Sequence, residues 1–301
     1  MTQITAKMVS DLRADTGVGM MECKKALVAT NGDMQLAKEA LRISGKASAE
    51  KKSSSRTAAD GGVTALCSDD NKTAVIVEIN CETDFVAREE GFKKFSVDVA
   101  KCALANKTDD VSELLTKDLT AGTTVETTRL ELVQQLGEHI AIRRIKTIQA
   151  PSNGVVAAYL HGGGVAARIG VLIALDVDDA NLAKDLAMHI AAMRPEFLDE
   201  QHVPEQRIAK EKEILLAQTQ EQNVGKPAEL LERIIAGKMG KFLKDITLLG
   251  QPFVKNPDQT VAALLAAAKA KIVDYVRYEV GEGIEKKTTD FVSEVMSQVK
   301  G

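Results

Sequence analysis

The sequence predicts an α+β protein made of an N-terminal helical module and a duplicated core of strands and helices. Apolar residues recur at helical spacing up to about residue 45, whereas β-branched runs set the pattern from Gly62 onward. A strand followed by a helix then occurs twice, and a charged pair of helices interrupts the second copy. The 301 residues are enough for such an organisation, since a domain typically needs ~150 residues.

Residues 1–45 are expected to form three short helices joined by tight turns. The first helix is marked by apolar residues at helical spacing, namely Ile4, Met8, Val9 and Leu12. Asn31 and Gly32 are typical of a helix C-terminus, and Asp33 is typical of the N-cap of the next helix. Residues 46–61 are rich in small, polar and basic side chains, which indicates a linker or a frayed helix.

Residues 62–149 are predicted to form the first half of the core. VTALCS and TAVIVEIN have the composition of strands and flank the polar turn DDNK, so they are expected to pair as an antiparallel hairpin. Helical spacing returns in FKKFSVDVAKCALA, DVSELLT and TTRLELVQQLGEHI, and IRRIKTIQA is the next predicted strand. Between the second strand and the first of these helices lies the segment NCETDFVARE, which begins at Asn80.

Residues 150–301 are predicted to form the second half of the core, which begins by repeating the first. ARIGVLIALD (167–176) resembles TAVIVEIN, and DLAMHIAA (185–192) aligns with DVAKCALA (98–105). The two copies differ between strand and helix, where the first has TDFVAREE and the second has only VDDA. A segment present in one copy alone is a candidate for function, because architecture is common to both copies.

Residues from about 200 to 248 are expected to form an antiparallel pair of helices that protrudes from the core. The first of these helices is highly charged with a thin apolar stripe, and NVGKP turns the chain into the second. A helix, TVAALLAAAKA, and a strand, IVDYVRYEV, complete the core. A C-terminal helix is predicted at about residues 288–300, where the letters TDFV occur again at 289–292.

Composition narrows the classes of function. The net charge of −4 and the pI of about 5.7 weigh against nucleic acid as the main partner, because duplex-binding proteins usually have a basic face. The apolar runs are too short to cross a bilayer, and the N-terminus lacks the pattern of a signal peptide. The four cysteines include no C-x-x-C pair, so they are expected to be reduced thiols in a cytoplasmic protein.

No set of residues predicts catalysis, a cofactor or a bound metal. HGGG (161–164) matches the oxyanion loop of some hydrolases, but that assignment also needs a G-x-S-x-G elbow, which the sequence lacks. A glycine-rich turn is therefore the favoured interpretation. No P-loop and no HExxH motif occurs, and the histidines are scattered, at His139, His161, His189 and His202. His189 lies among alanines and is expected to be a partly buried side chain with satisfied hydrogen bonds.

Asp84 and Phe85 stand where a strand gives way to a helix. Thr83 is a good N-cap, so Asp84 would lie in the first turn, where its charge suits the helix dipole whether or not it also faces a partner. Phe85 is either a hydrophobic staple or core contact, or an interface anchor presented at the tip of the turn, since aromatic residues dominate binding hot spots. Phe92 and Phe95 on the following helix are the better candidates for the core.

The chain contains, in order, the segments ITAKMVSDLRADTGVGMMECKKAL, AADGG, EINCETDFVAREEGF, GEHIAIRR, AMHIAAMRPEFL, LLGQPFV and RYEVGEGIEK before a terminal TDF. With these segments spread over essentially its whole length, the sequence resembles the bacterial elongation factor Ts family, the guanine-nucleotide exchange factors for elongation factor Tu. HGGGVAARIGVL departs from the family pattern, in which the glycines lead more directly into RIGVL. VAA therefore looks like a small insertion in this turn.

The resemblance implies that the N-terminal module is similar to ubiquitin-associated domains and docks on the nucleotide-binding domain of elongation factor Tu. Arg13, Met20 and Met21 match positions that touch the partner in the family. The alternative for Met20 and Met21 is that they begin a helix that caps the module. Contact with the partner is favoured, because adjacent methionine side chains cannot both face one small core.

The resemblance also implies a role for four consecutive residues of the core, Thr83, Asp84, Phe85 and Val86. They are expected to insert beside the magnesium site of the partner. Phe85 would wedge between apolar side chains there, and Asp84 would perturb the groups that hold the ion through water.

The function implied by the resemblance is nucleotide exchange without catalytic chemistry. The protein would bind elongation factor Tu with GDP, displace the magnesium ion and promote GDP release so that GTP can bind during translation elongation. The expected partner is elongation factor Tu, GDP-bound and nucleotide-free, and the helical hairpin is a candidate surface for a homodimer, although the sequence does not fix the oligomeric state. No cofactor, metal, nucleic acid or membrane is expected as a direct ligand.

Two alternatives belong to other functional classes. A non-catalytic binding or chaperone protein would explain the helical module and the hairpin but would leave TDFV without a purpose. A hydrolase would use HGGG. Release of GDP from elongation factor Tu separates the first alternative from exchange, and a screen of ester substrates tests the second.

Overall fold

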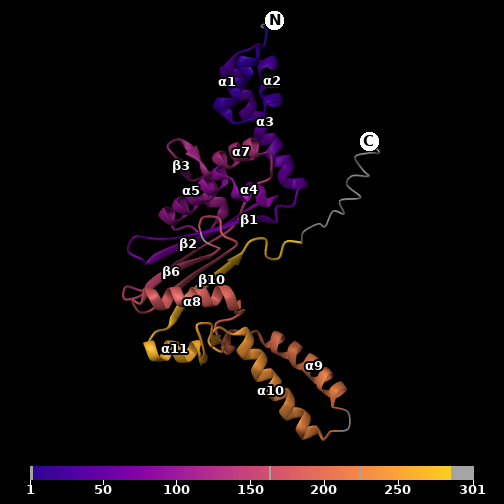
Figure 1. Cartoon of the computed structure of the whole chain (residues 1–301), viewed down its shortest axis with the longest axis vertical. Helices are drawn as coiled ribbons and strands as arrows, with labels where there is room; N and C mark the ends of the chain where they lie inside the picture. Colours follow the sequence, from indigo (N-terminus) through magenta and orange to yellow (C-terminus); the bar gives the residue numbers. More distant parts are fainter. Residues whose placement is uncertain (1–2, 163, 224–225, 286–301) are drawn as a thin grey trace.

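A computed structural model describes residues 3–162, 164–223 and 226–285 of the chain, so the C-terminal helix predicted at about 288–300 lies outside the described residues. Figure 1 shows an elongated molecule with the helical N-terminal module at one end, a core of sheets and helices in the middle and a helical hairpin at the other end. Helices and several small antiparallel sheets make up the described chain, so the predicted α+β class is confirmed.

The N-terminal module consists of α1 (Ala6–Thr16), α2 (Met20–Ala29) and α3 (Met34–Ser55). The turn between α2 and α3 has the geometry that the sequence predicts. Asn31 and Gly32 adopt positive φ angles of 52° and 85°. The Asp33 carboxylate then caps α3, because it accepts hydrogen bonds from the amides of Gln35 and Leu36 at 2.9 Å.

α3 continues to Ser55, so of the two interpretations of residues 46–61, a linker or a frayed helix, a helix is what forms as far as Ser55. The segment contains alanine, lysine and glutamate, which favour helices, and it has no proline. The start of α3 is packed on the core, where Nε2 of Gln134 on α7 (Val125–Leu136) donates a hydrogen bond to the carbonyl oxygen of Leu41 at 2.9 Å. A packed start favours propagation, and one continuous helix therefore leads from the module towards the core.

The first half of the core is built on an antiparallel sheet in the order β1-β2-β5. Its strands are β1 (Asp60–Cys67), β2 (Thr73–Cys81) and β5 (Ala141–Gln149). The elements between β2 and β5 are α4 (Asp84–Arg88), α5 (Glu90–Asn106), α6 (Val111–Thr116), β3 (Asp118–Thr120), β4 (Thr123–Thr124) and α7. The hairpin predicted across DDNK is confirmed. Phe92 and Phe95 of α5 are buried, as the sequence predicts.

The second half is built on an antiparallel sheet in the order β10-β7-β6. Its strands are β6 (Val155–His161), β7 (Ile169–Leu175) and β10 (Ile272–Glu279). The elements between β7 and β10 are α8 (Ala180–Met193), the 3-10 helix η1 (Glu200–His202), α9 (Glu205–Gln222), α10 (Ala228–Ile246), β8 (Pro252–Phe253), β9 (Asn256–Thr260) and α11 (Val261–Ala268). Each half is a strand hairpin, a helix and a third strand beside the second, so the two halves repeat one topology.

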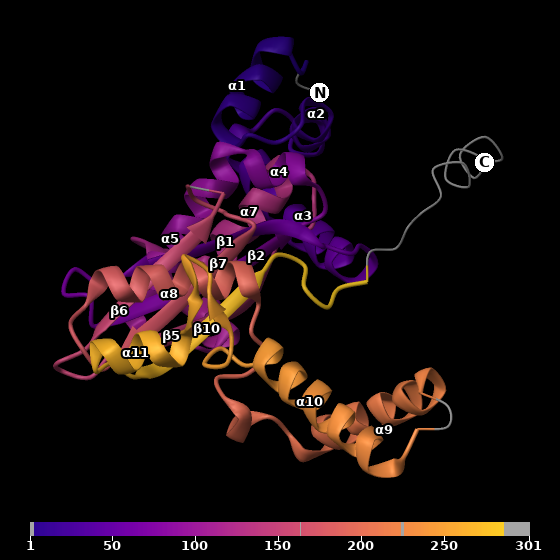
Figure 2. The same ribbon diagram turned by 60° about the horizontal axis from the view of Figure 1, so that its bottom comes forward.

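The two sheets pack face to face, and helices cover their outer faces (Figures 1 and 2). The layer between the sheets is apolar and is formed by Val63, Ala65, Ala74, Ile76, Ile148, Val156, Leu172, Ala174, Tyr278 and Val280. The sheets approach each other closely at Gly170, where an added Cβ atom would lie 2.5 Å from Cγ1 of Val63. Val63 also exchanges backbone hydrogen bonds with Ala167 at 2.8 and 2.9 Å, which joins the sheets at this edge.

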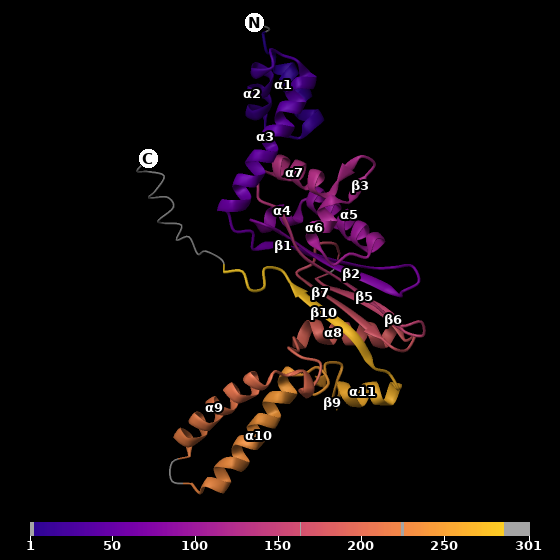
Figure 3. The same cartoon turned by 180° about the vertical axis from the view of Figure 1, so that it is seen from behind.

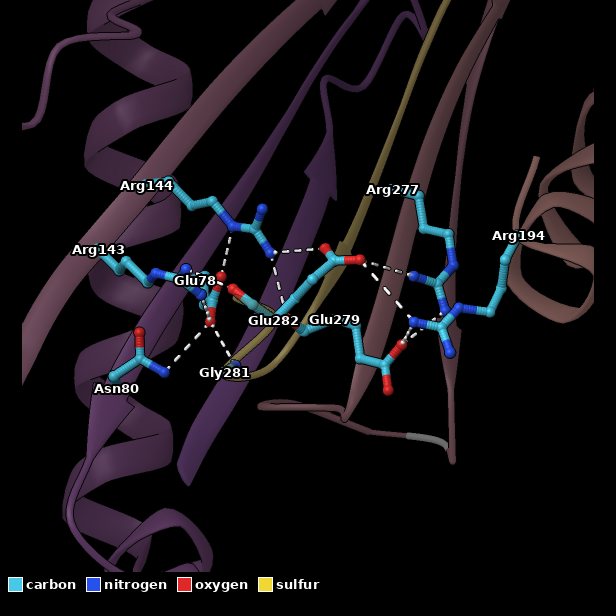
Figure 4. Close-up of polar contacts among 9 residues, drawn as sticks. All are labelled: Glu78, Asn80, Arg143, Arg144, Arg194, Arg277, Glu279, Gly281 and Glu282. Atoms are coloured by element: carbon cyan, nitrogen blue, oxygen red, sulfur yellow. Dashed lines mark hydrogen bonds and ion pairs between the residues drawn. The ribbon is translucent and has the colours of Figure 1, made fainter. Parts of the chain in front are cut away.

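A buried carboxylate ties the first sheet to the segment that leaves the second sheet (Figure 4). Glu78 on β2 is fully buried, and its two oxygens accept hydrogen bonds from the guanidinium groups of Arg143, at 3.0 Å, and Arg144. The same carboxylate accepts from the backbone N–H of Gly281 at 2.8 Å and from the side-chain amide of Asn80 at 3.2 Å. Because a buried charge is tolerated only when it is paired and hydrogen-bonded, these contacts fix the chain just after β10.

His189 is fully buried on α8, and its hydrogen bonds define a neutral ring. Nε2 lies 3.0 Å from Oε1 of Gln251 and donates to it, whereas Nδ1 accepts from the amide of Val254 at 3.1 Å. The prediction of a satisfied histidine is therefore confirmed, although the burial is complete rather than partial.

We expect His189 to make the protein less stable in acid. Burial lowers the pKa of His189 below the ordinary value of 6.5, and a proton on Nδ1 would oppose the N–H of Val254. The unfolded chain therefore binds this proton more readily, so the free energy of unfolding is unaffected above about pH 6.5 and falls as the pH falls below it.

The check is the thermal midpoint at about pH 7.5 and about pH 5.5, on either side of the ordinary histidine pKa. The wild type should lose more on acidification than His189→Gln, whose amide donates and accepts but does not titrate. Equal losses in the two proteins would remove His189 as a cause.

Candidate functional site

α4 forms a short exposed helix between the end of β2 and the start of α5. The Thr83 hydroxyl caps it by accepting a hydrogen bond from the N–H of Val86 at 3.5 Å, and Asp84 occupies the first turn, as the sequence predicts. Val86 is buried at 7% exposure, whereas the neighbouring Phe85 is 75% exposed. One side chain thus anchors the helix in the core of the first half, and the next one faces solvent.

The exposure of Phe85 decides between its two interpretations. A staple or a core contact would bury the ring, as it does for Phe92 and Phe95, so that alternative is wrong. A large apolar side chain held in water by a folded support is typical of a surface that another molecule covers. The interface interpretation is the one that this geometry supports.

Asp84 lies on the solvent side of α4, where its carboxylate pairs with the guanidinium of Arg88 at 2.7 Å. The side chains are 53% and 75% exposed, respectively, so the ion pair adds little to stability. The negative charge of Asp84 is favourable in the first turn of a helix, and the carboxylate is also accessible to a partner. The structure is therefore compatible with both interpretations of Asp84, the helix-dipole interaction and contact with a partner.

The start of α4 is bonded to the loop that follows α7. Glu138 accepts hydrogen bonds from the backbone N–H of Thr83 at 3.0 Å and from the Thr83 hydroxyl at 2.7 Å. In the opposite direction, Glu82 accepts a hydrogen bond from the backbone N–H of His139 at 2.6 Å. Two neighbouring residues of one segment are thereby bonded to two neighbouring residues of the other, and we call Glu82, Thr83, Glu138 and His139 the carboxylate clamp.

Cys81 lies just before the clamp and is not a nucleophile. Its buried thiol donates a hydrogen bond to the carbonyl oxygen of Thr83 at 3.1 Å. Burial, together with the nearby carboxylates of Glu138 and Asp60, raises the pKa of the thiol to about 12. The thiol therefore stays protonated at neutral pH, and its contribution here is the hydrogen bond.

Arg13, Met20 and Met21 lie exposed on the N-terminal module. Arg13 is on α1, and the two methionines begin α2 with 53% and 65% of their side chains exposed. Both residues begin α2, as the alternative has it, and neither is part of the buried core of the module, so contact with the partner stays a prediction that their exposure allows. Figures 1 and 3 both show the module beyond the core that carries α4, so the sequence-predicted residues form two separate groups.

Sequence reasoning missed further apolar side chains on the same module. Val28, Leu36 and Ile43 are 58%, 53% and 75% exposed. Leu36 and Ile43 lie two turns apart on one face of α3, whereas the buried Ala37 and Leu41 lie on another. A helix with a second apolar face is a signal that could have identified these residues.

Of the HGGG segment, His161 ends β6, and Gly162 and Gly164 lie in turn or bend conformation. Gly162 and Gly164 have φ angles of 96° and 80°, which other residues rarely adopt, and Gly163 lies outside the described residues. In the parts of the chain that the structure describes, no group of three or more His, Cys, Asp or Glu side chains could hold a metal ion. Within those same parts, no helix has both the length and the apolar character that crossing a membrane requires.

Fold and site together indicate a protein that acts by binding another protein. Exposed methionine, aliphatic and phenylalanine side chains lie on two folded supports, the N-terminal module and α4. Aromatic and methionine side chains are enriched at protein interfaces, and the duplicated core holds α4 in place through buried contacts.

Comparison with known proteins identifies the family. The family model described as "Elongation factor TS" matches residues 82–282. The chain is 53% identical over 297 residues to elongation factor Ts of Methylococcus capsulatus and 51% identical over 298 residues to that of Thioalkalivibrio sulfidiphilus, with 99% of each chain covered. It is 47% identical over 300 residues to elongation factor Ts of Legionella pneumophila, with 100% of both chains covered. The chain belongs to the elongation factor Ts family, which confirms the resemblance seen in its sequence.

Proposed function

We propose that the protein is the guanine-nucleotide exchange factor of elongation factor Tu in translation elongation, and that it acts in the cytoplasm. It binds elongation factor Tu with GDP, displaces the magnesium ion and promotes GDP release so that GTP can bind. Membership of the elongation factor Ts family supports the exchange function. The observation that carries the mechanism is Phe85, 75% exposed on a helix that Val86 anchors in the core.

The proposed mechanism works through the metal ion of the partner. GDP is held by its phosphates, largely through magnesium and a phosphate-binding loop. When Phe85 and Asp84 move the groups that support the ion, the ion binds less tightly and the diphosphate loses its counter-charge. Exchange factor and nucleotide thus bind with negative coupling, and this coupling is reciprocal, so GDP weakens the binding of the exchange factor by the same factor.

Magnitudes show that Phe85 cannot act alone. A coupling of about four decades needs ~5.5 kcal/mol of differential binding. Burial of one phenylalanine side chain contributes only ~1.5–3 kcal/mol. The N-terminal module and the core must therefore hold the complex while α4 deforms the nucleotide site, and their contacts must favour the nucleotide-free partner.

The test is release of a fluorescent GDP analogue from elongation factor Tu, followed by stopped flow with excess unlabelled GDP. Added exchange factor should raise the release rate in a saturable manner. An unchanged release rate would overturn the proposal and leave the non-catalytic binding or chaperone function as the alternative.

We expect Met20 and Met21 to contribute more to affinity than to the maximal rate. In the double variant Met20→Ser, Met21→Ser, the concentration of exchange factor that gives half-maximal GDP release should rise by at least about tenfold, because burial of each methionine contributes ~1.5–3 kcal/mol. The maximal rate should fall by a smaller factor, since α4 is untouched and only part of the contact energy of the module needs to favour the nucleotide-free partner. A lower maximal rate at unchanged half-saturation would contradict this division of roles.

A homodimer through the helical hairpin is part of the proposal. Ile208, Leu216, Ile235, Met239 and Leu243 contribute to the lining of a groove of about 730 Å³ between α9 and α10. Leu216 is 43% exposed, so a second copy could cover apolar surface here. The mass of the protein in solution, measured by sedimentation equilibrium, tests this part of the proposal separately from nucleotide exchange.

A further inference from the structure

We infer that Glu138 is a positioning residue, which acts on the partner only through α4 by holding the start of this helix in the orientation that presents Phe85. The inference rests on the proposed exchange function. Glu138 lies in the loop after α7, far along the chain from Thr83, and its carboxylate bonds both the backbone and the side chain of Thr83.

α4 needs such support because it is too short to be stable by itself. It contains five residues, and isolated helices of this length do not persist in water. Its own N-cap bond, from the N–H of Val86 to the Thr83 hydroxyl, is long at 3.5 Å. The hydroxyl has a much shorter bond to Glu138, at 2.7 Å, so the position of the cap is set by the carboxylate.

The carboxylate is chemically suited to this role. An acceptor with two oxygens can bind the N–H and the O–H of one residue together, and hydrogen bonds to a charged acceptor are stronger than those between neutral groups. The bonds go to opposite oxygens, Oε2 for the N–H and Oε1 for the hydroxyl, which fixes the direction of the chain at Thr83 as well as its position. Glu82 bonds the neighbouring His139 in return, so the two segments cannot slide past each other without breaking both sets of bonds.

Phe85 depends on this support because its exposed ring has little packing to orient it. The buried side chain of Val86 fixes one point of α4, and the carboxylate clamp fixes a second point at Thr83. Without the clamp, α4 keeps its apolar contacts at Val86 and Ala87 and the thiol bond from Cys81, but the Thr83 side chain and backbone N–H lose their carboxylate partner, so the direction of the helix is less tightly defined. Loss of Glu138 should therefore misdirect Phe85 and leave the core of the first half intact.

The first experiment measures the free protein. Amide hydrogen exchange at Val86 and Ala87 should become at least about tenfold faster in Glu138→Ala than in the wild type, because the capping bonds open more often. Amides of β2 should keep their protection, which shows that the variant is folded. Unchanged exchange at both amides would overturn the inference, whether or not the protein acts on elongation factor Tu.

The second experiment is GDP release from elongation factor Tu. Glu138→Ala should lower the maximal rate by about tenfold or more, since small displacements of a positioned group cost large factors in rate, and should leave half-saturation nearly unchanged. Thr83→Val, which removes the hydroxyl that bonds Glu138, should lower the maximal rate in the same direction. Glu113→Ala, which removes a carboxylate from α6 on another part of the first half, is the matched control and should release GDP at the wild-type rate.

A double variant separates positioning from general damage. If Glu138 acts through Phe85, then Glu138→Ala should have little further effect once Phe85→Ala is present. Independent, multiplying losses would overturn the positioning role. Inactivity of the wild type would instead overturn the proposed exchange function, so the two failures are distinguishable. If Glu138→Ala does not fold, Glu138→Gln keeps the volume and one acceptor and should give a smaller loss in the same direction.

Discussion

Replacing Phe85 by alanine is expected to lower the maximal rate of GDP release from elongation factor Tu by about ten- to a hundredfold, and to lower overall affinity by less. The estimate follows from the ~1.5–3 kcal/mol that burial of a phenylalanine side chain contributes. The effect should fall mainly on the rate, because the N-terminal module still docks and the ring is needed only where α4 deforms the nucleotide site. Stopped-flow release of a fluorescent GDP analogue, over a range of exchange-factor concentrations, separates rate from affinity.

Stability provides an internal control for this variant. Phe85 is 75% exposed, so its removal should leave the thermal midpoint of the free protein unchanged. Phe85→Leu keeps an apolar side chain and should retain part of the rate, whereas Val273→Ala removes exposed apolar surface from β10 and should have no effect. A wild-type rate for Phe85→Ala would exclude Phe85 from the mechanism.

Removal of both arginines that pair with Glu78 is expected to cause the largest loss of stability. The double variant Arg143→Met, Arg144→Met leaves the Glu78 carboxylate fully buried without a positive partner. Breaking a buried ion pair in this way costs about 3–5 kcal/mol, since the remaining charge is uncompensated. The free energy of unfolding should fall by that amount in urea titrations.

Two probes suit this measurement. The chain has no tryptophan, so far-UV circular dichroism follows the helices and tyrosine fluorescence follows the three tyrosines. One of these is Tyr278, whose ring centroid lies 4.0 Å from the guanidinium carbon of Arg144. Adding Glu78→Gln to the double variant removes the buried charge and should recover a substantial part of the stability. No recovery would mean that the loss arises from packing of the arginine side chains rather than from the unpaired carboxylate.

The local features of the candidate site could be predicted from sequence. Thr83 as N-cap and Asp84 in the first turn follow from the preferences of these residue types at helix starts. Phe92 and Phe95 on the next helix were the better candidates for the core, whereas Phe85 kept two interpretations until its exposure decided between them. These predictions succeeded because they depend on residues within one or two turns of each other.

The support of the site could not be predicted in the same way. Glu138 is separated from Thr83 by the whole of α5, α6 and α7, and no periodic pattern links two polar residues at such a distance. The same holds for Glu78. Its sequence context predicts only that it lies in a strand, whereas its partners come from β5 and from the segment after β10. Polar contacts of this kind depend on how the elements pack, and sequence periodicity reports only which face of an element is apolar.

The length of α3 was also underestimated. Small, polar and charged residues indicate a linker when they stand alone, but the same residues continue a helix that has already formed and packed. The first half of α3 packs in the module and on α7. The helix is therefore already nucleated when the chain reaches residue 46.

The unbroken α3 sets the distance between the N-terminal module and the core. With 22 residues it measures about 33 Å from end to end. Each residue inserted into it or deleted from it would turn the N-terminal end by about 100° around the helix axis, besides changing the separation. If the module and α4 contact two places on the partner at once, as proposed, the number of residues in α3 is therefore constrained.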